Sequence, residues 1–383
     1  MIQEYLQQYM LRLTTERSVK PGQLAITARN ETICSVGSRT LQMVTQRIAE
    51  RLDCAAVIAA EPASPFPLLL LQRSLAVTET LYPHDSESRS FLHDIPLVKS
   101  RKCQEECIDD ICAVLSRRKG CIVEGIGIVS HGDVTVEQAY ITWSSILHAS
   151  FIKYFEDLLA LGPLLSGEEN IVKKQKYNWL ETAAQIETGL QQRLPATIDA
   201  CVREICRAGK LTVQLGLVDS FFGNISCINN GNLYISQTAA RLDTLEGQID
   251  LIPSDGSATT GMTASSELPA HRAIYAAIGC KTVLHGHPRF PVIMSFFSET
   301  ATMIAPKTVA MIPVVSGEGG VGGLAEKLST AFQRAGTSAV IVKGHGVFAI
   351  GRKGFEEAMQ ALIATDRNCK IRYFQLLHER HNI

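Results

Sequence analysis

The sequence predicts an α/β protein in which one layered plan of strands and helices occurs twice. Two observations predict this fold class. Short β-branched and apolar runs alternate along the chain with longer segments of helical periodicity, the order typical of layered α/β folds. The second half also repeats the first. When Cys54 is laid on Cys280, "CAAVIAAEP" falls on "CKTVLHGHP" at an offset of 280 minus 54, or 226, residues.

The repeat continues toward the end of each copy. "CIVEGIGIVSHGDVTVEQAY" matches "VIVKGHGVFAIGRKGFEEAM", and "IKYF" at Ile152–Phe155 matches "IRYF" at Ile371–Phe374. There the offset is 374 minus 155, or 219, so the first copy contains seven additional residues. We predict a tandem duplication, with one domain over residues 1–162, a linker and helix over 163–190, and a second domain over 191–383.

The individual elements follow from the local patterns. Strands are predicted where short β-branched or apolar runs occur, at Ala55–Ala59, Cys121–Val129, Leu233–Ser236, Thr282–His287 and Ala339–Ile350. Helices are predicted over longer periodic segments, at Val136–Leu159, Leu180–Ala208, Ser265–Ile278, Gly323–Ala335 and Phe355–His378. The stretch "LGPLLSGEENIVKKQKYNW", Leu161–Trp179, combines glycine, proline and charge, which predicts an irregular linker.

Composition narrows the class of partner. The chain has 383 residues, of which 46% are apolar, enough for well-filled cores. A net charge of -1 argues against binding to nucleic acid or to an anionic membrane. No apolar run approaches the ~18 residues of a membrane helix. Eleven cysteines without framework spacing favour reduced thiols. We therefore expect a cytoplasmic protein with a small-molecule partner.

Candidate metal ligands occur in "VLHGHPRF". The Val-Leu lead-in predicts a strand, in which His285 and His287 point to the same face, as two ligands of one ion would. A single His-x-His is more often a surface or hydrogen-bonded core pair than a metal site. His345, in "KGHG" after the buried run "AVIVK", supplies a third imidazole beside a glycine that permits close approach.

The other copy lacks these imidazoles. Ala59 stands opposite His285, Glu61 opposite His287, and Ile126 opposite His345, whereas the glycines around His345 are matched in both copies. Backbone geometry explains glycines at equivalent turns of both copies. A structural need for the histidines would apply to both copies as well. The difference therefore favours a metal site in the second copy.

A carboxylate completes the candidate site. Glu267 begins a predicted helix in "SSELPAHRAIY" and is a possible oxygen ligand or base, and its counterpart is Leu41. The alternative is a first-turn acid favoured by the helix dipole. His271, opposite Thr45, is either a supporting group or a satisfied core histidine. Three imidazoles and a carboxylate suit Zn²⁺, and also Mn²⁺, Co²⁺ or Fe²⁺.

Further residues suggest contacts with substrate. "FFGNIS" contains a glycine-asparagine turn, which with Ser265 and Ser266 at a helix start could form an anion cradle, although such a turn is usually only a turn. Arg289 follows "HGHP" and either grips a substrate carboxylate or is a surface arginine. "SGEGGVGG" lacks the ending of a nucleotide-binding loop.

In chain order, "GNIS", "SSE" with a histidine four residues on, "HGHP" and "KGHG" followed by "FEEAM" resemble the motifs of the class II aldolase/adducin family. The resemblance covers roughly Ile198–Phe374, and the first copy looks like a degenerate member. It implies a three-layer α/β/α sandwich around a mixed, mostly antiparallel sheet, present twice.

The resemblance also implies residue roles. His285, His287 and His345 would hold Zn²⁺ or a similar ion, and Glu267 would act as ligand and proton shuttle. Gly223, Asn224, Ser265 and Ser266 fall on phosphate-binding positions. The sequence departs from the family where Ala239 follows Thr238 in place of glycine, where Phe221 and Phe222 precede "GN", and at Ile228 in place of an arginine.

The implied activity is that of a divalent-metal-dependent lyase, which cleaves or forms a carbon–carbon bond through a metal-stabilised enediolate. Its substrate would be a small hydroxy-carbonyl compound, a sugar or sugar acid, either phosphorylated or unphosphorylated. Decarboxylation, dehydration and epimerisation at the same site are alternatives, as is a non-catalytic adducin-like scaffold. The family's four-fold tetramers suggest that this duplicated chain forms a homodimer that mimics a tetramer.

Overall fold

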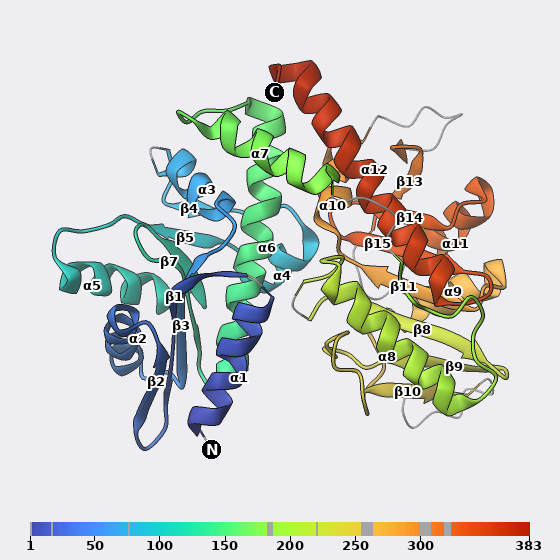
Figure 1. Ribbon diagram of the computed structural model, residues 1–383, viewed down its shortest axis with the longest axis horizontal. Coiled ribbons are helices and arrows are strands. Elements are labelled where there is room, and N and C mark those ends of the chain that lie inside the picture. The colour runs from blue at the N-terminus through green and yellow to red at the C-terminus, as the bar shows by residue number, and fades with distance from the viewer. Residues whose placement is uncertain are drawn as a thin grey trace. The chain divides into compact units, whose positions relative to one another are not determined.

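The computed structural model describes residues 2–16, 18–75, 77–181, 187–219, 221–253, 263–298, 308–317 and 323–383. The chain forms two compact units, each with its own sheet and covering helices (Figure 1). Unit 1 is Met1–Asp157 with Leu164–Glu168, and unit 2 is Leu158–Pro163 with Glu169–Ile383. No helix in the described ranges is both long and apolar enough to cross a membrane.

The sheet of unit 1 is mixed and mostly antiparallel. Its strands lie in the order β2-β1-β3-β7-β6-β5-β4, and within the described part of this unit only the β5–β6 pair is parallel. The strands are β1 (Val19–Arg29), β2 (Ile33–Gly37), β3 (Ala56–Pro62), β4 (Thr80–Leu81), β5 (Ile95–Val98), β6 (Gly120–Val123) and β7 (Gly127–Gly132).

Helices cover both faces of this sheet. Figure 1 shows α2 and α5 on one face and α1 and α6 on the other. Val44 and Ile48 illustrate the cause, since apolar residues four apart on α2 share one buried stripe facing the sheet. The helices of this unit in chain order are α1 (Ile2–Thr15), α2 (Arg39–Leu52), α3 (Phe66–Ser74), α4 (Ser86–Leu92), α5 (Gln104–Leu115) and α6 (Val136–Leu161). The next helix, α7 (Glu168–Glu181), lies almost wholly in unit 2.

The sheet of unit 2 has the same plan. Its order is β10-β9-β8-β11-β15-β14-β13-β12, which is the unit 1 order with β10 added at one edge, and among the described residues only the β13–β14 pair is parallel. The predicted duplication and fold class are confirmed. The strands are β8 (Asn224–Asn229), β9 (Asn232–Ser236), β10 (Ile249–Ile252), β11 (Thr282–Gly286), β12 (Thr308–Val309), β13 (Ile312–Val315), β14 (Ala339–Val342) and β15 (Gly346–Gly351).

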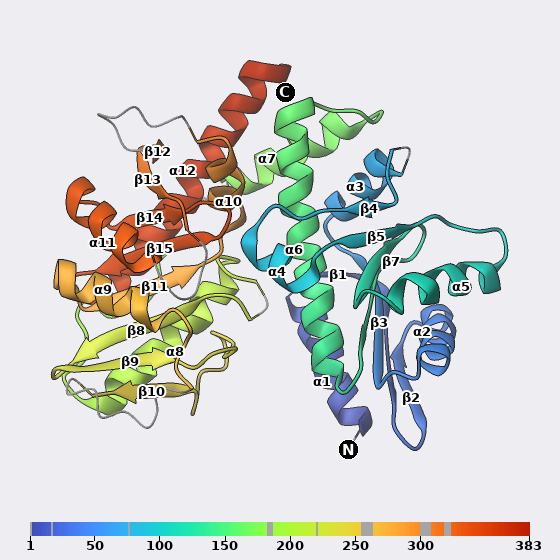
Figure 2. The same cartoon turned by 180° about the vertical axis from the view of Figure 1, so that it is seen from behind.

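Unit 2 is likewise layered. Helices α9 (Leu268–Ile278) and α11 (Leu324–Ala335) lie side by side on one face, as Figure 2 shows, and bury a core that includes Ile274, Phe332 and Phe348. Helices α8 (Ile198–Gln214) and α12 (Phe355–His381) cover the other face, and α10 (Arg289–Phe296) packs against α12. Each sheet is therefore the middle layer of an α/β/α sandwich.

Two predicted strands were wrong because each is a hairpin. Cys121–Val129 divides into β6 and β7, and Ala339–Ile350 divides into β14 and β15. The turns contain Gly125 (φ 79°) and Gly344 (φ 66°), a left-handed conformation that favours glycine and reverses the chain. These glycines are the ones that match between the two copies.

The predicted helix Leu180–Ala208 was also wrong. Helix α7 ends at Glu181, α8 begins at Ile198, and the described residues 187–197 are not helical. Pro195 has no N–H to donate and disfavours helical geometry in the residue before it, so one helix cannot run through this segment. Most of the predicted irregular linker is instead helical, since it contains α7. Val172 is buried and packs this helix against the protein. This single apolar contact is hard to recognise in a sequence that is otherwise rich in charge.

Candidate metal centre

Three histidines from two strand ends meet in one buried space. His285 lies in β11, His287 follows its last residue, and His345 occupies the turn before β15, the antiparallel neighbour of β11. One ligand atom of each lies within 4.8 Å of those of the other two. The three side chains are 1%, 2% and 2% exposed. The pairing of β11 with β15 thus brings together residues sixty positions apart in sequence.

The hydrogen bonding of His285 fixes which nitrogen faces this space. Its Nδ1 donates to the carbonyl oxygen of Val347 at 3.0 Å, which leaves the Nε2 lone pair directed at Nε2 of His345, 3.2 Å away. The ring also stacks on Phe348 at 4.1 Å. Burial lowers the pKa of His285 to about 4, so the imidazole is neutral at pH 7, the state that binds a metal.

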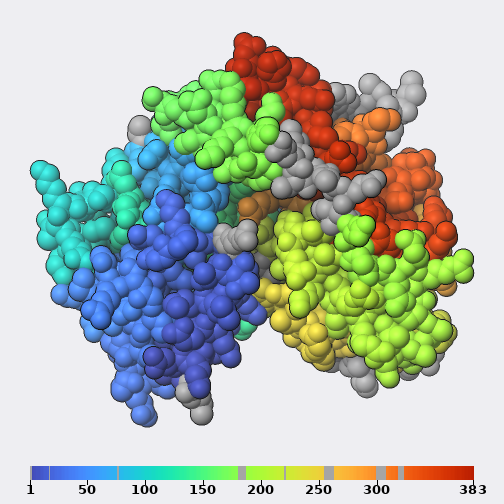
Figure 3. Space-filling model, viewed as in Figure 1, coloured from blue at the N-terminus to red at the C-terminus, as the bar shows by residue number. Residues whose placement is uncertain are grey.

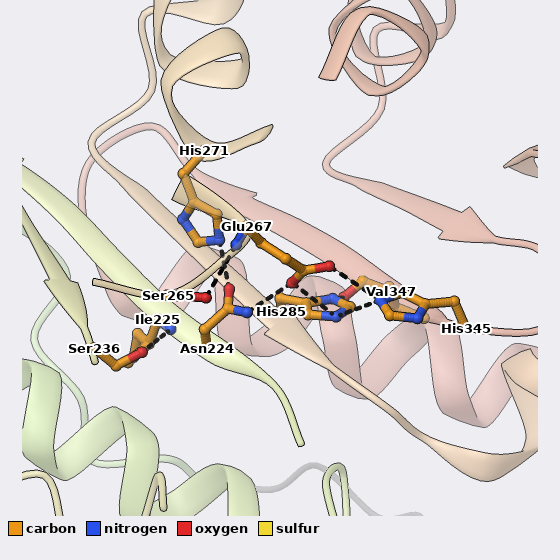
Figure 4. A network of polar contacts seen from close by, with 9 residues as sticks. All are labelled: Asn224, Ile225, Ser236, Ser265, Glu267, His271, His285, His345 and Val347. Carbon is orange, nitrogen blue, oxygen red and sulfur yellow. Dashed lines mark hydrogen bonds and ion pairs between the residues drawn. The ribbon is translucent and has the colours of Figure 1, made fainter. Parts of the chain in front are cut away.

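Glu267 faces the same nitrogens. Its Oε1 lies 3.0 Å from Nε2 of His345, and its Oε2 lies 3.3 Å from Nε2 of His285 (Figure 4). Burial by itself would raise the pKa of Glu267, but nearby His285 and hydrogen bonds from His345 and Asn224 outweigh it and keep the pKa below its usual value. The carboxylate is therefore ionised. It stands at the N-cap of α9 rather than in its first turn.

A directed chain of hydrogen bonds leads to this carboxylate. The Nδ2 of Asn224 donates to Oε2 of Glu267 at 2.6 Å, and its Oδ1 accepts from Nε2 of His271 at 2.6 Å. The Nδ1 of His271 is then an acceptor, 2.6 Å from the hydroxyl of Ser226. The hydroxyl of Tyr275 lies 2.7 Å from the same Ser226 oxygen. Because an ionised carboxylate can only accept, the direction of each bond in this series is fixed. Tyr275 donates to Ser226, Ser226 to His271, His271 to Asn224, and Asn224 to Glu267.

His271 is therefore more than an isolated core histidine. It is fully buried, and burial lowers its pKa to about 3, so it is neutral with one donor and one acceptor nitrogen. Both ring nitrogens form hydrogen bonds, Nε2 with Asn224 and Nδ1 with Ser226. Sequence reasoning missed Ser226 and Tyr275. The available signals were the i, i+4 spacing of His271 and Tyr275 on α9 and the alternation of Asn224 and Ser226 on β8.

The residues expected to cradle an anion lie at the site with different contacts. Gly223 has φ 80°, and an added Cβ would come within 2.6 Å of the His285 carbonyl oxygen, so glycine permits β8 to approach β11. The Asn224 amide is engaged by Glu267 and His271. Ser265 is buried, and its Oγ accepts from the backbone N–H of Glu267 at 3.3 Å, whereas Ser266 is exposed. Asn224 and Ser265 therefore mainly hold Glu267 in position.

Other singled-out residues surround the centre. Arg289 forms a two-pronged ion pair with Asp219, at 2.7 and 2.9 Å, so its guanidinium is already paired within the chain. The ring of Phe222 lies 5.5 Å from that of His287 and makes one wall apolar. Ala239 adopts φ 59°, so alanine occupies a left-handed position where the family often has glycine.

Unit 1 has none of these ligands at the equivalent positions. Asn224 pairs with His285 across the sheet of unit 2, and Ala25 pairs with Ala59 at the same place in unit 1. One part of the polar network is kept there, since Thr27 bonds Thr45 at 2.6 Å where unit 2 has Ser226 and His271. The scaffold is shared, and the candidate metal ligands are specific to unit 2.

Comparison with known proteins agrees with this geometry. Residues 203–373 match the family model described as Class II Aldolase and Adducin N-terminal domain. Unit 2 resembles the class II aldolases. No match was found among curated proteins.

Among solved structures, L-fuculose-1-phosphate aldolase from Thermus thermophilus is 22% identical, over 46% of this chain and 94% of that one, with a TM-score of 0.38. A sugar-phosphate aldolase from Thermotoga maritima is 21% identical, over 48% and 97%, with a TM-score of 0.37. The N-terminal class II aldolase domain of a conserved protein from Thermoplasma acidophilum is 15% identical, over 48% and 98%, with a TM-score of 0.36.

The donor set of this class II aldolase-like unit fits a divalent ion. Neutral imidazole nitrogens and one ionised carboxylate are the usual ligands of catalytic zinc and related metals. Nδ1 of His285, the ring nitrogen that points away from the other histidines, donates to the backbone carbonyl of Val347. Metal-ligating histidines commonly have such a hydrogen bond on the nitrogen that does not bind the metal. His285, His287, His345 and Glu267 are the residues that would hold the ion.

Proposed function

We propose that unit 2 is a divalent-metal-dependent lyase of class II aldolase type, which acts on a small hydroxy-carbonyl substrate such as a sugar or sugar acid. The observation that carries the proposal is the cluster of three buried histidine nitrogens with an ionised carboxylate against them. A purely structural core has no need for four such groups, and a buried charge is costly unless it is paired.

The residues divide the work as follows. His285, His287 and His345 would hold the ion, which supplies Lewis-acid polarisation of a carbonyl next to the bond that is broken or formed. Glu267 lies against two of these histidines, so its carboxylate is placed to take a proton from the substrate and return it. Phe222 excludes water beside His287 and strengthens these electrostatic interactions.

Asn224 keeps Glu267 available for this role. Its amide donates to one carboxylate oxygen and leaves Oε1 turned toward His345. A carboxylate that accepts hydrogen bonds is stabilised in its charged form, which is the form that accepts a proton. The hydrogen bond from His271 prevents the Asn224 side chain from flipping, since a flipped amide would place two acceptors or two donors together.

Metal analysis of full-length, untagged protein tests the metal site. We expect about one equivalent of a divalent ion in the wild type and little in His345→Ala. His378→Ala, at an exposed position of α12, is the matched control and should retain the metal. If neither the wild type nor the control holds an ion after zinc, manganese, cobalt or iron is added and excess removed, the lyase proposal fails and the adducin-like scaffold is preferred.

The reaction type is tested on the metal-loaded protein. Carbon–carbon cleavage releases two carbonyl products from a hydroxy-carbonyl substrate, decarboxylation releases carbon dioxide, dehydration forms a double bond, and epimerisation changes only configuration. We expect release of an aldehyde, and loss of that release in Glu267→Gln, which keeps the shape of the side chain and removes its charge. Turnover by any of the other three routes, without aldehyde release, would reassign the reaction.

Two further proposals come from the sequence. We propose that the chain forms a homodimer. The enzymes of the family that the sequence resembles often assemble as four-fold tetramers, and a chain with two such units needs only half as many copies for the same arrangement. Light scattering at micromolar concentration should give twice the chain mass of 41.9 kDa, and a monomer would contradict this. A cytoplasmic location is proposed from the eleven free cysteines, and fractionation of the source cells would check it.

A further inference from the structure

Unit 2 has a hollow at the end of its sheet away from the histidines. Its volume is about 380 Å³, within the range of small-molecule sites. It is lined by residues from the segment before α8, the end of β8 and the approaches to β11 and α12: Arg193, Leu194, Pro195, Ala196, Ile228, Asn229, Asn230, Lys281, Arg352 and Lys353. Lys281 precedes β11 and His287 follows it, a separation of about 20 Å along an extended strand.

The walls of this hollow are fixed by hydrogen bonds. The backbone N–H of Leu194 donates to the carbonyl of Lys353 at 2.9 Å. The side chain of Asn229, 9% exposed, donates to the carbonyl of Pro195 at 3.0 Å. The N–H of Ile228 donates to the carbonyl of Lys281 at 2.9 Å. The segment before α8 is therefore tied to the sheet end, and the hollow is formed before any ligand arrives.

The lining is strongly positive. Arg193, Lys281, Arg352 and Lys353 supply four cations, and none of the described residues that line the hollow is acidic. Within the described ranges, none of these four side chains forms an ion pair. Glu357 is nearby, but its carboxylate accepts from the backbone N–H groups of Arg352 and Lys353, at 2.5 and 2.9 Å. Like charges gathered without counter-charges repel one another, and a bound anion removes that repulsion.

The equivalent place in unit 1 is not positive. By the same offsets that align the two copies, Lys281 stands opposite Ala55, Arg352 opposite Asp133 and Lys353 opposite Val134. The sheet registers confirm these offsets, since Thr282 pairs with Gly351 as Ala56 pairs with Gly132. The shared fold therefore does not require the cations, just as it does not require the metal-ligating histidines.

We propose that this hollow, the basic pocket of Arg193, Lys281, Arg352 and Lys353, binds a small molecule carrying at least two phosphate groups. Arginine forks bind phosphate oxygens in pairs and lysines act as point charges beside them. Four cations exceed the charge of a single phosphate, and the volume exceeds its size. The inference is independent of the lyase proposal, because the basic pocket shares no residue with the metal centre.

Titration calorimetry with inorganic pyrophosphate tests the basic pocket. The full chain is used after chelator treatment, so that bound metal does not contribute, and at constant ionic strength, so that screening is the same for every variant. We expect saturable binding, about tenfold weaker in Arg352→Ala/Lys353→Ala, because each removed cation takes charge-assisted hydrogen bonds with it. Arg193→Ala/Lys281→Ala provides a second variant from the other walls, should the first fold poorly by circular dichroism.

Two controls separate this site from general surface charge and from the metal centre. Lys210→Ala/Arg334→Ala removes the same charge from exposed positions of α8 and α11, and should bind as the wild type does. The outer face of α8, yellow-green in Figure 3, is open to solvent. His345→Ala should also bind normally. Equal weakening in either control, no saturable binding below about 1 mM, or inorganic phosphate binding as tightly as pyrophosphate would overturn the proposal.

Discussion

Replacing Asn224 by leucine should both destabilise unit 2 and weaken its metal binding. Leucine has nearly the same shape, but it can neither donate to Glu267 nor accept from His271, two contacts of 2.6 Å each. Glu267 and His271, which would each lose a hydrogen-bond partner, are both buried, at 5% and 0% exposed. An unsatisfied neutral donor costs about 1–3 kcal/mol and a charged acceptor more, so we expect the metal-free unit to lose about 3–5 kcal/mol.

The assay follows unit 2 by itself. The chain's two tryptophans lie in different units, Trp143 in unit 1 and Trp179 in unit 2 beside Phe290. In a Trp143→Phe background, urea unfolding followed by fluorescence therefore reports unit 2. Asn368→Leu makes the same chemical change at an exposed position of α12 and should alter stability by less than about 0.5 kcal/mol.

Metal affinity is the second readout for Asn224→Leu. Loss of a group that orients a ligand typically weakens binding about 10–100-fold, and competition with a chelator measures this. A merely space-filling Asn224 would leave affinity unchanged, since leucine fills the same volume. If unit 2 loses no more stability than in Asn368→Leu, or if affinity is unaltered, the positioning role derived from the hydrogen-bond chain is wrong.

Three other outcomes are expected. Ala239→Gly should raise the unfolding free energy by about 1 kcal/mol, because alanine at φ 59° is strained and glycine is not; an unchanged urea midpoint would contradict this. Gly346→Ala should abolish metal binding, since its Cβ would lie 2.5 Å from the Gly286 carbonyl oxygen and 2.9 Å from His285; metal content equal to wild type would contradict this. His271 has a pKa of about 3 in the fold and about 6.5 unfolded, so the unfolded state binds protons first. Stability of the metal-free protein should therefore fall by about 1 kcal/mol per pH unit as pH drops below 6.5, and less steeply in His271→Gln; equal slopes would refute it.

The fold was predictable where its determinants are local or repeated. The structure places helices near Val136, Gly323 and Phe355 at nearly the predicted bounds, as Val136–Leu161, Leu324–Ala335 and Phe355–His381. The hairpin turns were missed because one glycine in an apolar run changes little in periodicity, while its left-handed φ reverses the chain. Edge strands such as β10 and β12 are short and depend on pairing, which no local pattern reveals.

The candidate site was predictable for a different reason. His285, His287, His345 and Glu267 could be singled out because the chain contains its own comparison, with Ala59, Glu61, Ile126 and Leu41 at the same places. The network behind them could not be predicted this way. Ser226 and Tyr275 join it only through the packing of α9 on β8, a tertiary contact, and each taken alone resembles an ordinary core residue.

The same comparison indicates why unit 1 carries none of the four candidate metal ligands, although it keeps the bond between Thr27 and Thr45. A buried carboxylate at Leu41 would have no amide donor at Ala25 and no imidazoles at Ala59 or Ile126, so its charge would be unpaired at a cost of several kcal/mol. Three histidines without that carboxylate would bring their nitrogen lone pairs close together with no charged partner beside them. Each residue is tolerable only when the others are present, so the site is gained or lost as a group. Glu61, opposite His287, has accordingly taken a different partner and forms an ion pair with Lys20. Building the same candidate metal site in unit 1 would therefore require all of these positions to change together, and any single replacement should only destabilise it.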